Sequence, residues 1–158
     1  MHRVMLGTRV RDFALPATGG RTFRLSECRG HNVVLYFYPR DNTPGCSQEA
    51  GDFRDQQARF RKLDTLILGV SRDGLASHER FRHKHGLKFE LLADEDARLC
   101  RLFGVLRQKN MYGRKFMGIE RSTFLIDSQG VLRKAWRKLR VTGHVADVLE
   151  AVKELASA

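Results

Sequence analysis

The strongest constraint on the fold is a run of six apolar or aromatic residues that ends at a proline. The run, VVLYFY at 33–38, has no alternation of polar and apolar side chains, which is typical of a strand buried on both faces. Pro39 ends it, because proline has no N–H to donate to a sheet. Thr43 and Pro44 then suit the N-cap and the first position of a helix. The sequence therefore predicts a buried strand, a short loop and a helix that extends to about residue 63.

Similar patterns predict the remaining elements. Short apolar segments at 13–15 and 22–25 flank Gly19-Gly20, a turn signal, and indicate an N-terminal hairpin. We expect a second buried strand, a basic helix, a short helix closed by a glycine, a long loop with two glycine hinges, a strand hairpin and an amphipathic C-terminal helix. In that order these cover residues 66–70, 71–85, 94–104, 108–119 (hinges Gly113 and Gly118), 122–136 and 144–156.

The order of these elements predicts an α/β fold. Two strands joined through a helix are parallel, and the final pair forms an antiparallel hairpin. The expected architecture is a thioredoxin-like fold with a mixed central sheet, helices on both faces and an N-terminal hairpin extension. At 158 residues the chain fits one domain, residues 1–158. No apolar run approaches the length of a membrane span, and the N-terminus has no signal-peptide pattern, so we expect no membrane association and a cytoplasmic protein.

Charge is the unusual bulk property, because the formal net charge is +11. Residues 98–140 contain twelve Lys or Arg side chains, against Glu120 and Asp127 as the acids. One interpretation is a nucleic-acid or polyanion-binding surface, and the other is a solvated basic face with one or two active-site cations. No zinc-finger spacing or aromatic RNA-binding motif supports a dedicated nucleic-acid module, so we expect nucleic acid not to be the main partner.

The three cysteines, Cys28, Cys46 and Cys100, contain no C-x-x-C pair and are too few for a disulfide framework. Any cysteine chemistry therefore depends on a single activated thiol. Cys46 is the candidate, because it falls in the first turn of the predicted helix, where free N–H groups and the helix dipole favour a thiolate. Gly45 leaves room for a substrate to approach the sulfur. The alternative is a buried cysteine that only fills space at the start of the helix.

The pattern P-x-x-x-T-x-x-C at 39–46 resembles the active-site motif of the peroxiredoxins, and specifically of the bacterioferritin comigratory protein (peroxiredoxin Q) subfamily. The resemblance extends along essentially the whole chain. Its other blocks are Asp12-Phe13, Ser71-Arg72-Asp73, the residues 91–94 and the residues 118–126. A match of several blocks is far more specific than the motif alone.

The resemblance implies a thiol-dependent peroxidase that reduces hydrogen peroxide and organic hydroperoxides without metal or cofactor. Cys46 would be the peroxidatic cysteine, which attacks the O–O bond and becomes a sulfenic acid. Thr43 would supply a hydroxyl to thiolate and peroxide, Pro39 would shield the sulfur from water, and Arg121 would favour the thiolate and hold the peroxide. Arginine suits that role because it is always charged and presents a fork of donors. Glu49 either orients this guanidinium or is an exposed helix carboxylate.

The chain departs from the subfamily at its resolving cysteine. The two usual positions are Gly51, five residues after Cys46, and Arg82 in the following helix. Cys100 resembles an inert core thiol, and Cys28 precedes a strand whose far end Cys46 follows, about 20 Å away. We therefore predict a one-cysteine mechanism, in which an external thiol from a thioredoxin or glutathione/glutaredoxin system attacks the Cys46 sulfenate.

Further expectations concern the oligomeric state, an alternative function and the histidines. The protein is expected to be a monomer or weak homodimer, and a polyanion-binding protein on a degenerate peroxiredoxin scaffold is the alternative function. The histidines of the basic helix, His78, His83 and His85, are expected to be solvated surface residues and not metal ligands. His144 is expected to help start the C-terminal helix.

Overall fold

The computed structural model describes residues 3–157. A seven-stranded sheet has the order β2-β1-β5-β4-β3-β8-β9, and β6 and β7 form a separate two-stranded sheet. The strands are β1 (Ala14–Ala17), β2 (Arg21–Arg24), β3 (Asn32–Phe37), β4 (Thr65–Ser71), β5 (Glu90–Ala93), β6 (Leu106–Met111), β7 (Arg114–Ile119), β8 (Ser122–Ile126) and β9 (Leu132–Trp136). The helices are α1 (Pro44–Lys62), α2 (Leu75–Lys84), α3 (Arg98–Phe103) and α4 (His144–Ala156), with a 3₁₀ turn at Leu25–Cys28.

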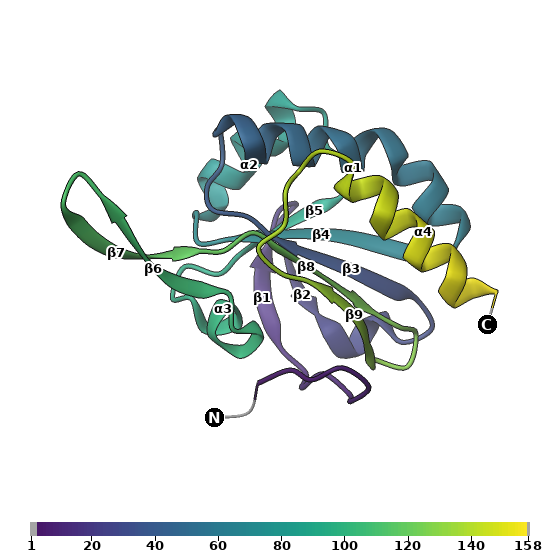
Figure 1. Ribbon diagram of the computed structural model, residues 1–158. Helices are drawn as coiled ribbons and strands as arrows, with labels where there is room; N and C mark the ends of the chain where they lie inside the picture. The colour runs from purple at the N-terminus through teal and green to yellow at the C-terminus, as the bar shows by residue number, and fades with distance from the viewer. Residues whose placement is uncertain (1–2, 158) are drawn as a thin grey trace.

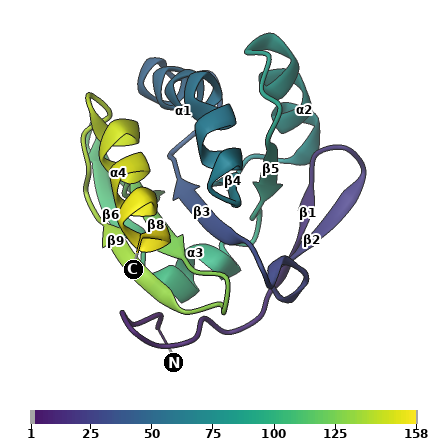
Figure 2. The same cartoon turned by 90° about the vertical axis from the view of Figure 1, so that its right-hand side faces the viewer.

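The central sheet is mixed, as predicted. Strands β3, β4 and β5 are parallel, whereas β8 and β9 are antiparallel additions at one edge and β1 and β2 at the other. Helices α1, α2 and α4 cover one face, and α3 lies on the other with the N-terminal segment (Figures 1 and 2). Alternate residues of β3 enter the two apolar cores, because successive side chains of a strand point to opposite faces. This explains the unbroken apolar run in the sequence.

The sequence did not predict the short strand between α2 and α3. Strand β5 is only four residues long and pairs with β4 in parallel, while Leu92 is also in register with Ala17 of β1. It therefore joins the N-terminal hairpin to the sheet. A run this short gives no period to read, so the element could not be recognised from its pattern.

The predicted loop at 108–119 is wrong. These residues lie in an antiparallel hairpin, β6–β7, with six paired positions and a two-residue turn at Tyr112-Gly113. Gly118 is a paired strand residue and not a hinge. The segment was mistaken for a loop because its side chains are mostly polar and basic, whereas the hairpin is held by backbone hydrogen bonds. Among residues 3–157, no helix combines the length and the apolar character that crossing a membrane requires.

Candidate active site

Cys46 lies in the first turn of α1, as predicted. Thr43 has extended backbone angles and is the N-cap residue, and Pro44 is the first residue of the helix. Helix α1 follows β3, so Cys46 sits beyond the carboxyl end of a central parallel strand, where α/β proteins place their sites. The residue is only 1% exposed. The sulfur is thus held close to the helix N-terminus, away from bulk water.

The guanidinium of Arg121 contacts the sulfur of Cys46. Its Nη2 atom lies 3.3 Å from the Sγ atom of Cys46. Arg121 directly precedes β8, which pairs with β3 so that Ser122 lies opposite Phe37, at the end of β3 that leads to Cys46. Gly45 makes this approach possible, because a Cβ atom there would lie 3.1 Å from Nη2. The room that the sequence assigned to substrate is therefore used, at least in part, by the guanidinium.

Glu49 holds the other side of this guanidinium. It is fully buried, and its Oε1 atom accepts a hydrogen bond of 2.6 Å from Nη1 of Arg121. Burial raises the pKa of Glu49 to about 7, although Arg121 acts to lower it. Burial alone would lower the pKa of Arg121, but Glu49 and Cys46 together raise it. Of the two roles left open for Glu49, the structure therefore supports orientation of Arg121 and excludes an exposed carboxylate.

Thr43 and Pro39 frame the loop that leads to Cys46. Both are half-buried. The hydroxyl of Thr43 donates to the backbone carbonyl of Arg40 at 3.0 Å, and it makes no cap bond to the helix. Its proton is therefore engaged, and its oxygen is left with a lone pair that can accept a hydrogen bond. Thr43 is suited to accept a hydrogen bond from the O–H group of a hydroperoxide more than to donate one to the sulfur.

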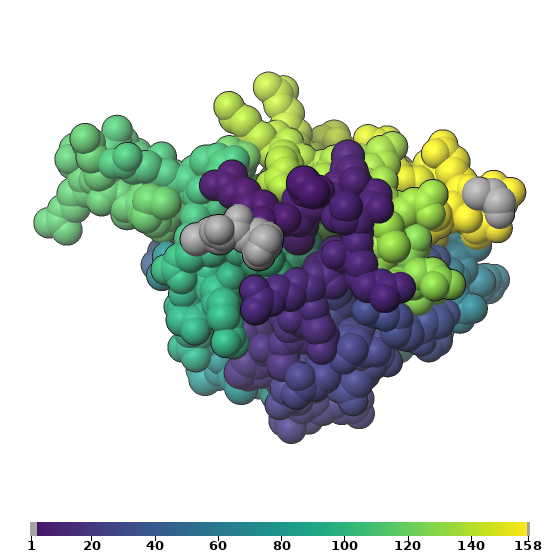
Figure 3. Space-filling view, turned by 90° about the horizontal axis from the view of Figure 1, so that it is seen from below, coloured from purple at the N-terminus to yellow at the C-terminus, as the bar shows by residue number. Residues whose placement is uncertain are grey.

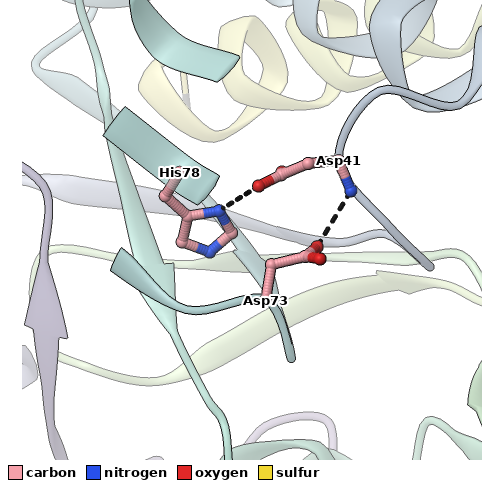
Figure 4. A group of neighbouring side chains, drawn as sticks. All are labelled: Asp41, Asp73 and His78. Atoms are coloured by element: carbon pink, nitrogen blue, oxygen red, sulfur yellow. Dashed lines mark hydrogen bonds and ion pairs between the residues drawn. The ribbon is translucent and has the colours of Figure 1, made fainter. Parts of the chain in front are cut away.

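A buried network that the sequence did not predict fixes the same loop. Asp41 accepts hydrogen bonds from the Tyr38 hydroxyl at 2.7 Å and from the Ser77 hydroxyl at 2.8 Å, and its Oδ2 atom lies 2.8 Å from Nδ1 of His78. The backbone N–H of Asp41 in turn donates to Asp73 at 2.8 Å (Figure 4). The loop between β3 and α1 is thus tied to α2 through side chains and backbone.

His78 is the centre of this network, and its predicted position on the surface is wrong. The residue is fully buried, and its Nε2 atom lies 2.9 Å from the Leu92 carbonyl, to which it must donate. Its Nδ1 atom faces the Oδ2 atom of Asp41 at 2.8 Å, so the ring connects the loop before α1 to β5. Burial alone would raise the pKa of Asp41, but the hydrogen bonds from His78, Tyr38 and Ser77 lower it overall. The signal in the sequence is that His78 shares a helix face with Phe81.

The potential ligand atoms of Asp41, Asp73 and His78 all lie within 4.8 Å of one another. Each has hydrogen-bond partners, because Asp73 Oδ2 also accepts from the Ser71 hydroxyl at 2.6 Å. The group therefore serves as it stands to position the loop that carries Thr43 and Cys46. Of the other two histidines of the helix, His83 is exposed and His85 is half-buried.

The remaining two thiols lie far from this arrangement. Cys28 and Cys100 belong to the core on one face of the sheet, whereas Cys46 packs in the core on the other face. All three cysteines are free. Burial raises the pKa of both Cys28 and Cys100, and the carboxylates of Glu27 and Asp94 act in the same direction. The central sheet thus separates both thiols from Cys46.

The sequence and the structure both match known proteins. Residues 6–135 match the model of the AhpC/TSA family. Peroxiredoxin Bcp of Bacillus subtilis is 46% identical over 97% of this chain and 98% of its own length, and Peroxiredoxin Bcp of Xanthomonas campestris is 48% identical over 90% and 89%. A solved structure of PrxQ from Xylella fastidiosa superposes with a TM-score of 0.92, at 39% identity and 99% coverage of both chains.

A further solved structure is of the bacterioferritin comigratory protein of Xanthomonas campestris, a protein with alkyl peroxide reduction activity. It has a TM-score of 0.87 at 46% identity and covers 91% of this chain and 92% of its own. The family match spans most of the chain, and the relatives match nearly end to end. The chain therefore belongs to the AhpC/TSA family, in its peroxiredoxin Q or Bcp branch, and is a thiol-dependent peroxidase.

Proposed function

We propose that Cys46 is the nucleophile of this peroxidase. The observation that carries the proposal is the guanidinium of Arg121, 3.3 Å from a buried sulfur in the first turn of a helix. The thiolate attacks one oxygen of the hydroperoxide, so that an S–O bond forms as the O–O bond breaks. The second oxygen leaves with the bonding electrons and takes up a proton to become water or an alcohol. Cys46 is left as a sulfenic acid.

The neighbouring residues have distinct roles in this step. Arg121 stabilises the thiolate and the negative charge that develops on the leaving oxygen, because donors aimed at that charge lower the barrier. Thr43 accepts a hydrogen bond from the O–H group of the hydroperoxide and so orients the O–O bond. Pro39 limits the access of water, and Glu49 holds the guanidinium in place from its buried side.

We propose that an external thiol completes the cycle. Its sulfur attacks the sulfenic sulfur of Cys46, forms a mixed disulfide and releases water, and a second thiol then attacks the mixed disulfide and frees Cys46. Placement of Cys28 and Cys100 across the sheet supports this one-cysteine route, as do Gly51 and Arg82 at the two usual resolving positions. The reductant belongs to a thioredoxin or a glutathione/glutaredoxin system.

Several parts of the proposal concern the protein as a whole. Its substrates are hydrogen peroxide and organic hydroperoxides, and the alkyl peroxide activity named for the Xanthomonas relative supports the second class. We further propose one domain over residues 1–158, a monomer or weak homodimer, and a cytoplasmic location. No cofactor is needed for the chemistry described.

The decisive experiment is the intact mass of fully reduced protein after one equivalent of hydrogen peroxide, with a sulfenate trap in a parallel sample. We expect a trapped sulfenic acid that maps to Cys46 and no disulfide. A rapid loss of two hydrogens would show that Cys28 or Cys100 resolves the intermediate and would refute the one-cysteine route. No change in mass would refute the role of Cys46.

A further inference from the structure

The hairpin β6–β7, residues 106–119, extends away from the rest of the molecule as an arm (Figures 1 and 3). Its strands pair only with each other. Near its base, Arg72 donates to the carbonyl of Met117 at 3.4 Å, and the N–H of Glu120 donates to the carbonyl of Val105 at 2.7 Å. The outer half of the arm therefore contributes little to the core, and its residue choice needs another explanation.

Apolar side chains gather on this exposed element. Half of the large hydrophobic residues that are exposed in the described chain lie on the arm, namely Met111, Tyr112, Phe116 and Met117. Aromatic residues, methionine and arginine are the residue types enriched at the centres of protein–protein interfaces. The composition of the arm is thus that of an interface, on a surface that the rest of residues 3–157 leaves exposed.

The residues of the turn also indicate a contact surface. Tyr112 and Gly113 have φ angles of 52° and 77°, which is the geometry of a two-residue turn that favours Asn-Gly. A tyrosine with positive φ is unfavourable, and this one is 98% exposed. The fold gains nothing from a bulky aromatic ring at this position. A contact outside the chain would account for it.

The charge of the arm selects the class of partner. Residues 106–119 contain Arg107, Lys109, Arg114 and Lys115 and no acidic residue. The side chains of Arg114 and Lys115, beside the turn, are exposed and have no hydrogen bond or ion pair within residues 3–157. A second copy of this chain would carry the same charge and be repelled. An acidic protein surface is complementary.

The base of the arm is joined to the residue that contacts the nucleophile. Strand β7 ends at Ile119, two residues before Arg121, whose guanidinium contacts Cys46. A six-residue strand spans about 20 Å, and a domain of about 100 residues has a radius of gyration of about 13 Å. A small protein docked on the arm is therefore large enough to present a thiol at the same time to the first turn of α1.

We propose that the β6–β7 arm is the docking site of the reductant, and that this reductant is an acidic protein dithiol. The inference rests on the proposed function and names the partner that reduces the Cys46 sulfenic acid. One thiolate of the partner attacks the sulfenic sulfur of Cys46, forming a mixed disulfide and releasing water. The partner's second thiol then attacks the partner sulfur that is bonded to Cys46. The partner leaves as an intramolecular disulfide, and Cys46 is released as a thiol. The two electrons come from the dithiol.

The test compares two reductants on the same enzyme. Peroxidase turnover is measured with a purified thioredoxin of acidic net charge and, in parallel, with dithiothreitol. We expect the double variant Arg114→Glu/Lys115→Glu to lower kcat/KM for thioredoxin by about tenfold or more, and to reduce its dependence on salt. The rate with dithiothreitol should stay unchanged, because that dithiol needs no docking site.

Two further variants make the result specific. Arg59→Glu/Lys62→Glu changes the charge equally at the far end of α1, more than about 19 Å along the helix from Cys46, and should leave both rates unchanged. Tyr112→Asn replaces the exposed ring by a residue that favours the turn. A purely structural role predicts no loss for this variant, whereas docking predicts a loss of about threefold or more with thioredoxin alone.

The inference is overturned if the thioredoxin rate survives the arm variants, if the dithiothreitol rate falls equally, or if the control variant has the same effect. It is also overturned if these variants abolish binding to phosphatidylglycerol vesicles or to a single-stranded oligonucleotide while the thioredoxin rate is unaltered, since the arm would then serve a membrane or a nucleic acid. If the unaltered protein shows no turnover with dithiothreitol, the proposed function itself fails, which is a distinct result.

Discussion

Two cysteines of this protein occupy the same position in two helices. Cys46 is the third residue of α1 and Cys100 is the third residue of α3, and they are 1% and 0% exposed. What differs is the charged group beside each. Arg121 lies 3.3 Å from the sulfur of Cys46, whereas Asp94 accepts the N–H of Cys100 at 2.8 Å. Neither burial nor position in the helix therefore distinguishes a nucleophile from an inert thiol, but the sign of the neighbouring charge does.

The starts of the two helices differ in charge in the same way. In α3 the carboxylate of Asp94 takes the N–H groups of both Leu99 and Cys100. A negative charge thus satisfies the helix start, and it opposes a second negative charge on the sulfur. In α1 the side chain of the N-cap residue Thr43 makes no cap bond, because its hydroxyl donates to the Arg40 carbonyl. The start of α1 remains positive and receptive to a thiolate and to an anionic leaving group.

The largest expected effect separates the two thiols directly. Cys46→Ser should reduce the peroxidase kcat/KM by about 10³-fold or more, because the nucleophile is lost. Cys100→Ala should leave the rate unchanged, since its sulfur lies in the core on the other face of the sheet. Stopped-flow reaction with hydrogen peroxide measures both. Comparable losses in the two variants would contradict the distinction.

The second effect concerns the cation beside Cys46. Arg121→Met keeps much of the side-chain volume but removes the charge, and should slow the reaction with peroxide by about 10²-fold. Arg121→Lys retains the charge without the fork of donors and should give an intermediate rate. The rate of alkylation by iodoacetamide at pH 7 should follow the same order. A Met variant with nearly normal rates would show that the charge beside the sulfur is not what distinguishes it from Cys100.

The sequence predicted the Cys46 side of this comparison well. The unbroken apolar run located β3, and Thr43 and Pro44 located the start of α1 to the residue. Short-range rules suffice here, because capping and burial on both faces leave a local pattern. The place of Arg121 beside the sulfur came from the family resemblance, since the pairing of β8 with β3 that creates it is a long-range contact.

Other features left only weak local patterns in the sequence. His78 lies in a polar helix with Arg80, Arg82 and Lys84, and only the tertiary fold shows that its side of the helix packs on Leu92 and Asp41. The β6–β7 arm has no buried face to impose alternation, and backbone pairing alone defines it. In both cases the partner is distant in sequence or belongs to the backbone, so composition was misleading.

A smaller effect tests how the uncapped start of α1 handles the substrate. Thr43→Val removes the oxygen that accepts a hydrogen bond from the hydroperoxide. This variant should lower the rate with peroxide by roughly threefold to tenfold, as expected for the loss of one neutral hydrogen bond. Thr43→Ser retains the hydroxyl and should stay near the unaltered rate. Alkylation by iodoacetamide should change little in either, because the Thr43 proton is directed to the Arg40 carbonyl. Equal alkylation losses in Val and Ser variants would refute this assignment.

The smallest expected effect on rate concerns Glu49, the buried carboxylate near Cys46. Its substitution should have a clearer effect on stability. Glu49 lies behind Arg121 and acts on the sulfur only through it, so Glu49→Gln, which keeps an acceptor for Nη1, should slow peroxide reduction only a few-fold. The stability effect depends on pH. Burial raises the pKa of Glu49 from 4.5 in its ordinary state to about 7 in the fold.

Between pH 4.5 and 7 the unfolded chain therefore loses a proton that the folded chain keeps, so the contribution of Glu49 to stability decreases as the pH rises. It is level below pH 4.5, where both states hold the proton, and again above pH 7, where neither does. Glu49→Gln removes this dependence. The free energy of unfolding of the variant should therefore rise, relative to that of the unaltered protein, by up to about 3 kcal/mol between pH 4.5 and pH 7. Urea unfolding at several pH values measures the difference. The opposite slope would mean that Arg121 outweighs burial, and that the carboxylate beside Cys46 stabilises the fold as an ordinary ion pair does.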